Sequence, residues 1–187
     1  MAPKVKITKD AIVKAAIKLV RQRGEMALNA RNIAASLSCS TQPIFSNFSS
    51  MEELRMAVIA QADKLCNQYI KDEIESGVYP AYKATGMAYI RFAKEECELF
   101  KLLYMRDRSQ EVVPKEIALD NEMEGLLHDN TGLAGAQAEL FHLEMWAFVH
   151  GIATMFATGF LNLDWELVSK ILTDAYQGIK TQFQKEF

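Results

Sequence analysis

The residues with the clearest catalytic spacing are Glu139 and His142, which form a Glu-x-x-His pair. Di-iron helical bundles use this spacing, but they need a second such pair and further carboxylates to hold the metals. Glu124 precedes His128 by four residues, which is a different spacing. The chain contains no HExxH, GxSxG or P-loop signature. The sequence therefore predicts no catalytic residue, no metal site and no cofactor, and an enzyme is the least favoured class of function.

A second cluster of side chains is suited to hydrogen bonding instead of catalysis. Neutral hydroxyl and amide groups accompany one aromatic ring between residues 40 and 47, in the set Ser40, Thr41, Gln42, Phe45, Ser46 and Asn47. Groups of this kind can bond to phosphate oxygens and to the edges of bases. The cluster is therefore a candidate for nucleic-acid recognition.

The charge distribution agrees with that interpretation. The whole chain has a net charge of −3, but residues 1–48 hold eight basic and two acidic residues, which is +6 and leaves −9 for the remainder. A basic end on an acidic body concentrates the attraction for phosphate at one end of the chain. A solvated charged helix face is the alternative explanation of these basic residues.

Apolar periodicity and capping residues predict the elements that carry the cluster. Three N-terminal helices are expected, over residues 8–24, 30–37 and 41–47. Thr8, Asn29 and Ser40 are the expected N-caps, and Gly24 is the expected end of the first helix. Two short helices joined by a turn, beside a longer basic helix, are typical of a helix-turn-helix that places its last helix in the major groove of double-stranded DNA.

The rest of the chain is expected to be helical as well. Ser50 and Glu53 have the spacing of a capping box at the start of a fourth helix that ends near residue 76. Further helices are predicted near residues 80–95, 96–106, 114–130, 135–160 and 164–186. With nine Gly, four Pro and half of its residues apolar, the chain is predicted to be all-α with about nine helices. We expect a DNA-binding domain over residues 1–50 and a ligand-binding and dimerisation domain over residues 51–187.

Cysteine spacing and hydropathy indicate a cytoplasmic protein. Cys39, Cys66 and Cys97 are widely spaced and form neither a CxxC pair nor a Cys/His cluster, which favours reduced thiols. The N-terminus lacks the apolar core of a signal peptide. Residues 145–163 carry no formal charge, but polar residues and glycines dilute this segment. We therefore interpret it as a packed helix and expect no membrane contact.

The segment IAASLSCSTQPIFSNFSSMEEL, within residues 8–58, resembles the DNA-binding domain of the TetR family of bacterial repressors. The family pattern has Tyr-x-x-Phe in the recognition helix and then Lys-Glu-Glu-Leu, where this chain has Phe45, Phe48 and Met51. Because the family's Tyr and Lys usually meet phosphates, both departures weaken the expected contact, as does Thr41 where the family often has Lys. We expect DNA contacts from Lys14, Arg21, Asn29, Arg31, Ser40, Thr41, Gln42, Phe45, Ser46 and Asn47.

The C-terminal part resembles the Trp-His-Gly branch of the same family, on YKATGMAYIRFAKEECELFKLLYM and MWAFVHGIATMFATGF, which includes Trp146, His150 and Gly151. The resemblance implies that the last two helices form a four-helix bundle with those of a second copy. A stripe of small residues permits close helix approach, and it comprises Ala147, Gly151, Thr154 and Thr158. Packing of this stripe within one chain is the alternative.

The middle helices carry many aromatic and Met residues, which suit an apolar ligand but are also typical of a core. The residues expected to line an effector pocket are Tyr89, Phe92, Phe100, Tyr104, Met123, Leu127, His142, Trp146 and His150. His142 and His150 are either ligand anchors or core histidines bonded to neighbours.

The function expected is that of a homodimeric repressor released from a near-palindromic operator by a small apolar or amphipathic effector. The alternative is a helical interaction module with weakened DNA binding.

Overall fold

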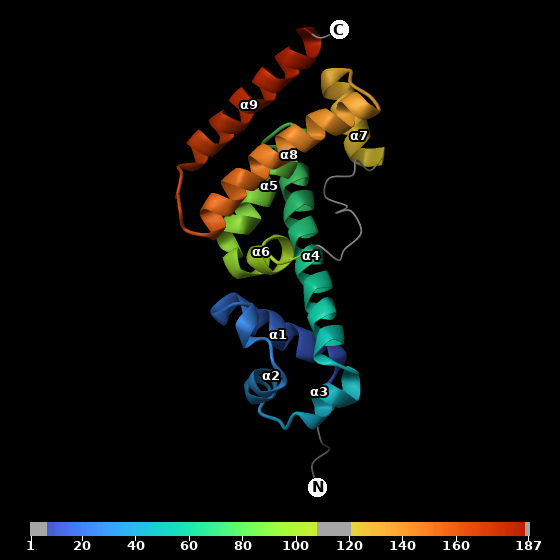
Figure 1. The fold of residues 1–187 in the computed structure, drawn as a ribbon, viewed down its shortest axis with the longest axis vertical. Coiled ribbons are helices and arrows are strands. Elements are labelled where there is room, and N and C mark those ends of the chain that lie inside the picture. Colours follow the sequence, from blue (N-terminus) through green and yellow to red (C-terminus); the bar gives the residue numbers. More distant parts are fainter. Residues whose placement is uncertain (1–6, 108–120, 186–187) are drawn as a thin grey trace. The chain divides into compact units, whose positions relative to one another are not determined.

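The computed structural model describes residues 7–107 and 121–185, and within these residues the chain is entirely helical (Figure 1). The elements are α1 (Lys9–Arg23), a 3₁₀ turn η1 (Glu25–Ala27), α2 (Ala30–Ser36), α3 (Gln42–Asn47), α4 (Met51–Ser76), α5 (Ala81–Glu95), α6 (Cys97–Tyr104), α7 (Asn121–Thr131), α8 (Ala136–Ala157) and α9 (Trp165–Lys185). The predicted all-α class is therefore confirmed. The part of the helix expected over residues 114–120 lies outside the described residues.

The helices form two compact units. The first unit comprises Met1–Cys66 and Glu96–Arg106, and it contains α1, η1, α2, α3, α6 and the beginning of α4. The second unit comprises Asn67–Glu95 and Asp107–Phe187, and it contains the end of α4 with α5, α7, α8 and α9. The functional division expected at residue 50 stays a prediction.

Local hydrogen bonds explain where the first helices begin and end. The Thr8 hydroxyl accepts from the amide of Ala11 at 3.2 Å, and the Asn29 side chain accepts from the amide of Asn32 at 3.0 Å, so both expected caps are confirmed. Gly24 ends α1 with a φ of +73°. A Cβ at this position would lie 2.7 Å from an Oε of Glu98, which can move because it ends a flexible side chain, so the positive φ is what favours glycine.

The predicted cap of α3 is wrong. The helix begins at Gln42, and Thr41 precedes it with helical backbone angles and no capping hydrogen bond from its side chain. The chain enters α3 from a tight turn in which Ser38 has a φ of +52°. An N-cap works from an extended residue that reaches forward, so Ser40 has no such role before an already helical Thr41.

The capping box of α4 forms only in part. The Ser50 hydroxyl accepts from the amide of Glu53 at 3.1 Å as predicted. The Glu53 carboxylate, however, accepts from the amide and the hydroxyl of Ser49, each at 2.7 Å, and also pairs with Lys9 at 3.0 Å. These bonds, the Ser49 amide first, lower the pKa of Glu53 to about 2. The hydroxyl half of the box is therefore in place, and only the carboxylate half is shifted by one residue, from Ser50 to Ser49.

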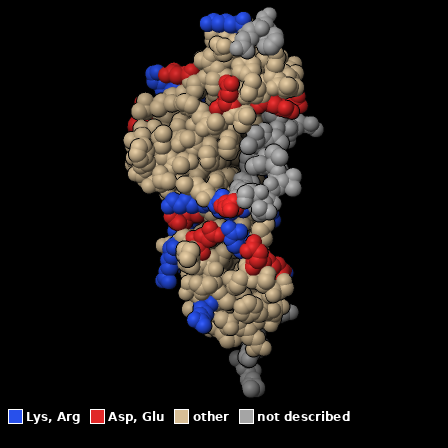
Figure 2. Space-filling view, viewed as in Figure 1, with Lys and Arg blue, Asp and Glu red and all other residues tan. Residues whose placement is uncertain are grey.

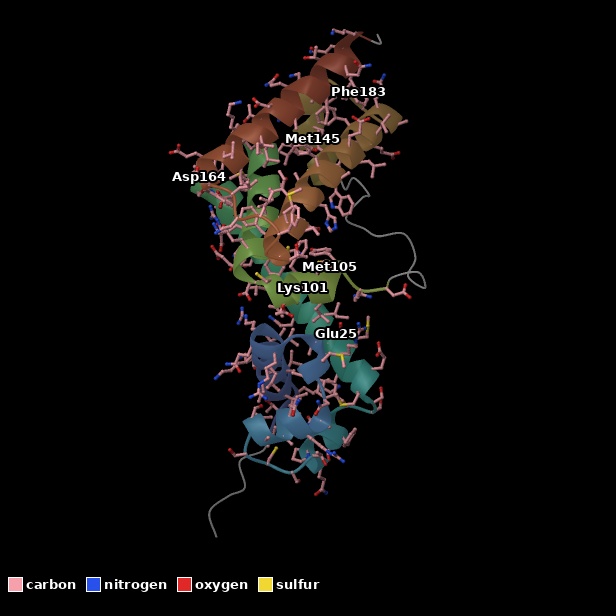
Figure 3. All side chains as sticks on the ribbon, turned by 60° about the vertical axis from the view of Figure 1, so that its left-hand side comes forward. Glu25, Lys101, Met105, Met145, Asp164 and Phe183 are labelled. Carbon is pink, nitrogen blue, oxygen red and sulfur yellow. The ribbon has the colours of Figure 1, made fainter. Side chains whose placement is uncertain are left out.

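The second unit is built on the contact between α5 and α8. Gly86 permits their close approach, since a Cβ there would lie 3.2 Å from a methyl group of Val149. A buried cluster joins α5, α7, α8 and α9, and it includes Met145 and Phe183, which Figure 3 labels. At the start of α9, the Asp164 carboxylate accepts from the amide of Glu166 at 2.9 Å, which caps the helix.

Candidate functional site

Helices α2 and α3 form the helix-turn-helix within the first unit, and both pack against α1. Ile33 and Ile44 are fully buried and Phe48 is only 3% exposed, so one side of each short helix faces the core of this unit. The opposite side of α3 is open, because Ser40, Gln42, Phe45 and Ser46 are exposed. The segment from Ser40 to Ser46 therefore presents the side chains that sequence analysis selected.

Several of the predicted contact residues already use their polar groups within the protein. The Ser46 hydroxyl donates to the carbonyl of Gln42 at 2.9 Å. The Asn47 amide donates to the carbonyls of Pro43 at 2.8 Å and Ile7 at 3.2 Å. Asn29, as described above, caps α2. These residues shape the helix-turn-helix, whereas Gln42 remains the amide on the exposed side of α3.

The basic residues of the first unit divide into those that form ion pairs within the protein and those that do not. Arg21 donates two hydrogen bonds to Glu96 at the start of α6, at 2.7 and 2.6 Å, and Glu96 is only 13% exposed. Arg21 therefore joins α1 to α6. Lys14 pairs with Asp10 one turn away at 2.8 Å, with both side chains exposed.

Four cations of the first unit have no ion-pair partner among the described residues, namely Lys18 and Arg23 on α1, Arg31 on α2 and Lys64 on α4. Of these, only Arg31 is among the DNA contacts predicted from the sequence. Net charge could not separate the two groups, because the partner of Arg21 lies 75 residues away in the chain.

The residues expected to line one effector pocket belong to both units. Phe100 and Tyr104 lie on α6 in the first unit, with ring centroids 5.0 Å apart, and the Tyr104 hydroxyl donates to the sulfur of Cys66 at 3.5 Å. The other residues of the predicted set lie in the second unit, as Tyr89, Phe92, Met123, Leu127, His142, Trp146 and His150. A single pocket lined by the whole set stays a prediction.

Within the second unit, two Tyr–His hydrogen bonds join α5 to α8. Tyr82 bonds to Nδ1 of His142 at 3.2 Å, and Tyr89 bonds to Nδ1 of His150 at 2.9 Å. The ring of Trp146 stacks on that of His150 with centroids 4.7 Å apart and 12° between the planes. Burial lowers the pKa of His150, which favours its neutral form. Both histidines therefore have partners, as the core alternative predicts.

The outward face of α8 is largely apolar, although it includes the exposed Glu144. Leu140, Leu143 and Phe148 are exposed, and Ala147 and Thr158 of the small-residue stripe are exposed beside them. Gly151 and Thr154 are half-buried, and a Cβ at Gly151 would meet no atom within 4 Å. Figure 2 shows a broad area of the second unit, over α8, with few charged side chains. The stripe therefore lies open at Gly151, and sequence analysis had not assigned Leu140 and Leu143 to it.

Two observations concern metals and membranes. In residues 7–107 and 121–185, no group of three or more His, Cys, Asp and Glu side chains could hold a metal ion. Among the helices described, α8 is long and apolar enough to cross a membrane by length and composition alone. An apolar helix that packs in a soluble bundle meets the same two criteria.

Comparisons with known proteins agree with this architecture. Residues 82–174 match the family described as tetracyclin repressor-like, C-terminal domain. A TetR family member from Streptomyces coelicolor A3 is 18% identical with a TM-score of 0.64, over 88% of this chain and 95% of its own. A TetR-like transcriptional regulator from Rhodococcus sp. RHA1 is 17% identical with a TM-score of 0.69, over 96% of this chain and 98% of its own. No curated protein matches the sequence.

The two solved structures share the all-helical fold over nearly the whole chain. The matched family covers the helices that carry the two Tyr–His hydrogen bonds and the apolar face of α8. The helix-turn-helix precedes them, as the resemblance of residues 8–58 implied. The chain belongs to the TetR family of transcriptional regulators, whose members in general bind DNA and dimerise.

Proposed function

We propose that this protein is a cytoplasmic transcriptional repressor that binds a near-palindromic operator as a homodimer and is released by a small apolar or amphipathic molecule. The observation that carries the proposal is the exposed side of α3, where Gln42 and Phe45 lie above a buried Ile44. A short helix held in this way can enter the major groove with its exposed side toward the base edges. No catalytic step belongs to the proposal.

A second copy of the chain is the proposed occupant of the outward face of α8. Leu140, Leu143 and Phe148 expose apolar surface on one side of α8, and Gly151 lets a second helix approach closely. One short recognition helix makes few base contacts, whereas a twofold pair reads two half-sites about 34–36 Å apart. Dimerisation through α8 therefore supplies what α3 alone lacks.

The inner side of α8 is the proposed location of the effector response. Tyr89, His150 and Trp146 combine apolar ring surface with hydrogen-bonding groups, which is the usual composition of a small-molecule site. An effector that favours one arrangement of the DNA-binding helices by about 1–3 kcal/mol would change operator affinity by roughly 5- to 150-fold. The chemical identity of the effector is open to screening once an operator is known.

The test is a selection of binding sites from random duplex DNA with the purified full chain, followed by titration of the selected site at two salt concentrations. The expected result is a near-palindromic consensus whose binding weakens steeply with salt. If a folded dimer enriched no sequence, the repressor proposal would fail. A helical interaction module, motivated by Phe45 and Met51 in place of the family's Tyr and Lys, would then be the better description.

A further inference from the structure

The exposed aromatic ring on α3 is unusual for its position. Phe45 is 53% exposed, whereas Phe48, three residues later, is 3% exposed and packs in the first unit. A half-exposed Phe adds less to the core than a buried one, and it cannot donate a hydrogen bond to a phosphate as a Tyr would. Its surroundings on the helix therefore indicate what it can contact.

Few polar groups on this side of the helix are available for base edges. Ser46 and Asn47 donate to backbone carbonyls within the protein. Gln42 and Phe45 remain, both exposed, three residues apart and therefore neighbours on one side of α3. Within α3, the exposed side chains without such a bond are thus one amide and one apolar ring, next to the hydroxyls of Ser40 and Thr41, which precede the helix.

These two groups match complementary features of the major groove. A Gln amide can form two hydrogen bonds with N6 and N7 of adenine, and an apolar side chain fits the C5 methyl group of thymine. Guanine and cytosine edges present no methyl group that the ring could cover. A ring beside an amide therefore favours a sequence that contains adenine and thymine close together.

We propose that Phe45 is a specificity-determining residue that contacts the C5 methyl group of a thymine in each operator half-site, close to an adenine bound by Gln42. This inference rests on the proposed function, since it requires α3 to enter the major groove. Phe45 in place of Tyr then exchanges a phosphate contact for a base contact. The exchange lowers affinity for DNA in general but raises discrimination between sequences.

The test uses the operator selected above, with each thymine replaced in turn by deoxyuridine at equivalent places in both half-sites. This replacement removes only the methyl group. One thymine position should lower the affinity of the native protein about fourfold per half-site, or roughly fifteenfold for both, since burial of one methyl-sized group is involved. Replacing the other thymines should change the affinity less than twofold.

The variant Phe45→Ala identifies the residue responsible. It should bind the thymine and deoxyuridine operators with equal affinity, because the ring that senses the methyl group is gone. Phe45→Tyr keeps the ring and should keep the sensitivity. Met56→Ala is the matched control, since Met56 is 50% exposed on α4 in the same unit and its loss should leave the sensitivity intact. Circular dichroism checks that each variant is folded.

The outcomes separate this inference from the function on which it rests. If the protein binds a defined operator and no thymine position responds to deoxyuridine, Phe45 does not read a methyl group. The same conclusion follows if Phe45→Ala retains the full response. If no operator is enriched at all, the DNA-binding proposal itself fails, and the exposed ring belongs to a protein contact.

Discussion

Helices α3 and α8 each leave one face without a partner in the described residues, but the two faces differ in chemistry. The six-residue α3 exposes an amide, a hydroxyl and one aromatic ring, whereas the longer α8 exposes Leu140, Leu143 and Phe148 beside small residues. A polar face with one ring suits a hydrated, charged partner such as duplex DNA. A largely apolar face suits a protein surface that excludes water, with the exposed Glu144 as its polar group. The composition of an exposed face is therefore more informative than exposure itself.

The two units also differ in the contacts that hold them together. Ion pairs join distant segments of the first unit, as between Arg21 and Glu96 at 2.6 Å and between Arg55 and Glu25 at 2.7 Å. The second unit combines an ion pair, between Arg91 on α5 and the buried Glu73 on α4, with aromatic packing and the Tyr–His hydrogen bonds between α5 and α8. Part of the positive charge near the N-terminus therefore stabilises the fold, and only the remainder is available for phosphates.

The largest effect is expected from filling the open position on α8. A Cβ at Gly151 meets none of the described atoms within 4 Å, and a leucine side chain there would hold a second helix away, so Gly151→Leu should weaken the dimer on the order of a hundredfold. Sedimentation at several protein concentrations measures the change. Gly125→Leu on α7 is the matched control, because that glycine is equally open. A Gly151→Leu protein that stayed dimeric would remove α8 from the interface.

The next largest effect is expected from the exposed side of α3, which is proposed to contact base edges. Gln42→Ala should lower affinity for the selected operator by about 1–3 kcal/mol and relax the base preference at one position. Arg31→Ala removes a cation without an ion-pair partner in the described residues. It should therefore weaken DNA binding evenly across sequences and reduce by about 1 the slope of log affinity against log salt concentration. Fluorescence anisotropy with operator and scrambled duplexes measures the affinities of both variants. Identical profiles for the two variants would contradict the division between base and phosphate contacts.

A smaller effect on stability is expected from the ion pair that joins α1 to α6. Arg21→Ala and Glu96→Gln should each destabilise the protein, with a coupling free energy of about 1–2 kcal/mol in a double-mutant cycle from urea unfolding. Lys14→Ala, which removes an exposed pair on the same helix, should change stability by less than about 0.5 kcal/mol. A coupling near zero would return Arg21 to the predicted DNA contacts.

The smallest effect is the pH dependence of the cap on α4. The pKa of Glu53 is lowered from 4.5 to about 2, so ionised Glu53 adds stability above pH 4.5 and this contribution is lost as the pH falls through 2. The melting temperature of Glu53→Gln should therefore lie a few degrees below that of the native protein at neutral pH, and the difference should vanish near pH 2. Glu52→Gln, an exposed neighbour, is the control. A difference in melting temperature that is unchanged down to pH 2 would show that the ionised Glu53 carboxylate does not stabilise the start of α4.

Much of the candidate site could be predicted from the sequence because its signals are local. Apolar spacing and turn residues located α2 and α3, and the burial of Ile44 and Phe48 against an exposed Gln42 agrees with that pattern. The cap assigned to Ser40 was wrong because the conformation of the preceding turn, with Ser38 at positive φ, is not encoded by residue type alone. The effector residues were predicted as one set because sequence order does not reveal that α6 packs with α1.

The sequence by itself determined the helical fold, the starts of α1 and α2 and the position of the helix-turn-helix, since caps and periodicity depend on residues three or four apart. Only the tertiary structure decided which basic residues are committed to the fold and which face of α8 is exposed. Those properties depend on partners that are distant in the chain, such as Glu96 for Arg21 and Tyr89 for His150. An ion pair or a packed face exists only when folding brings both sides together, and composition cannot show which sides meet.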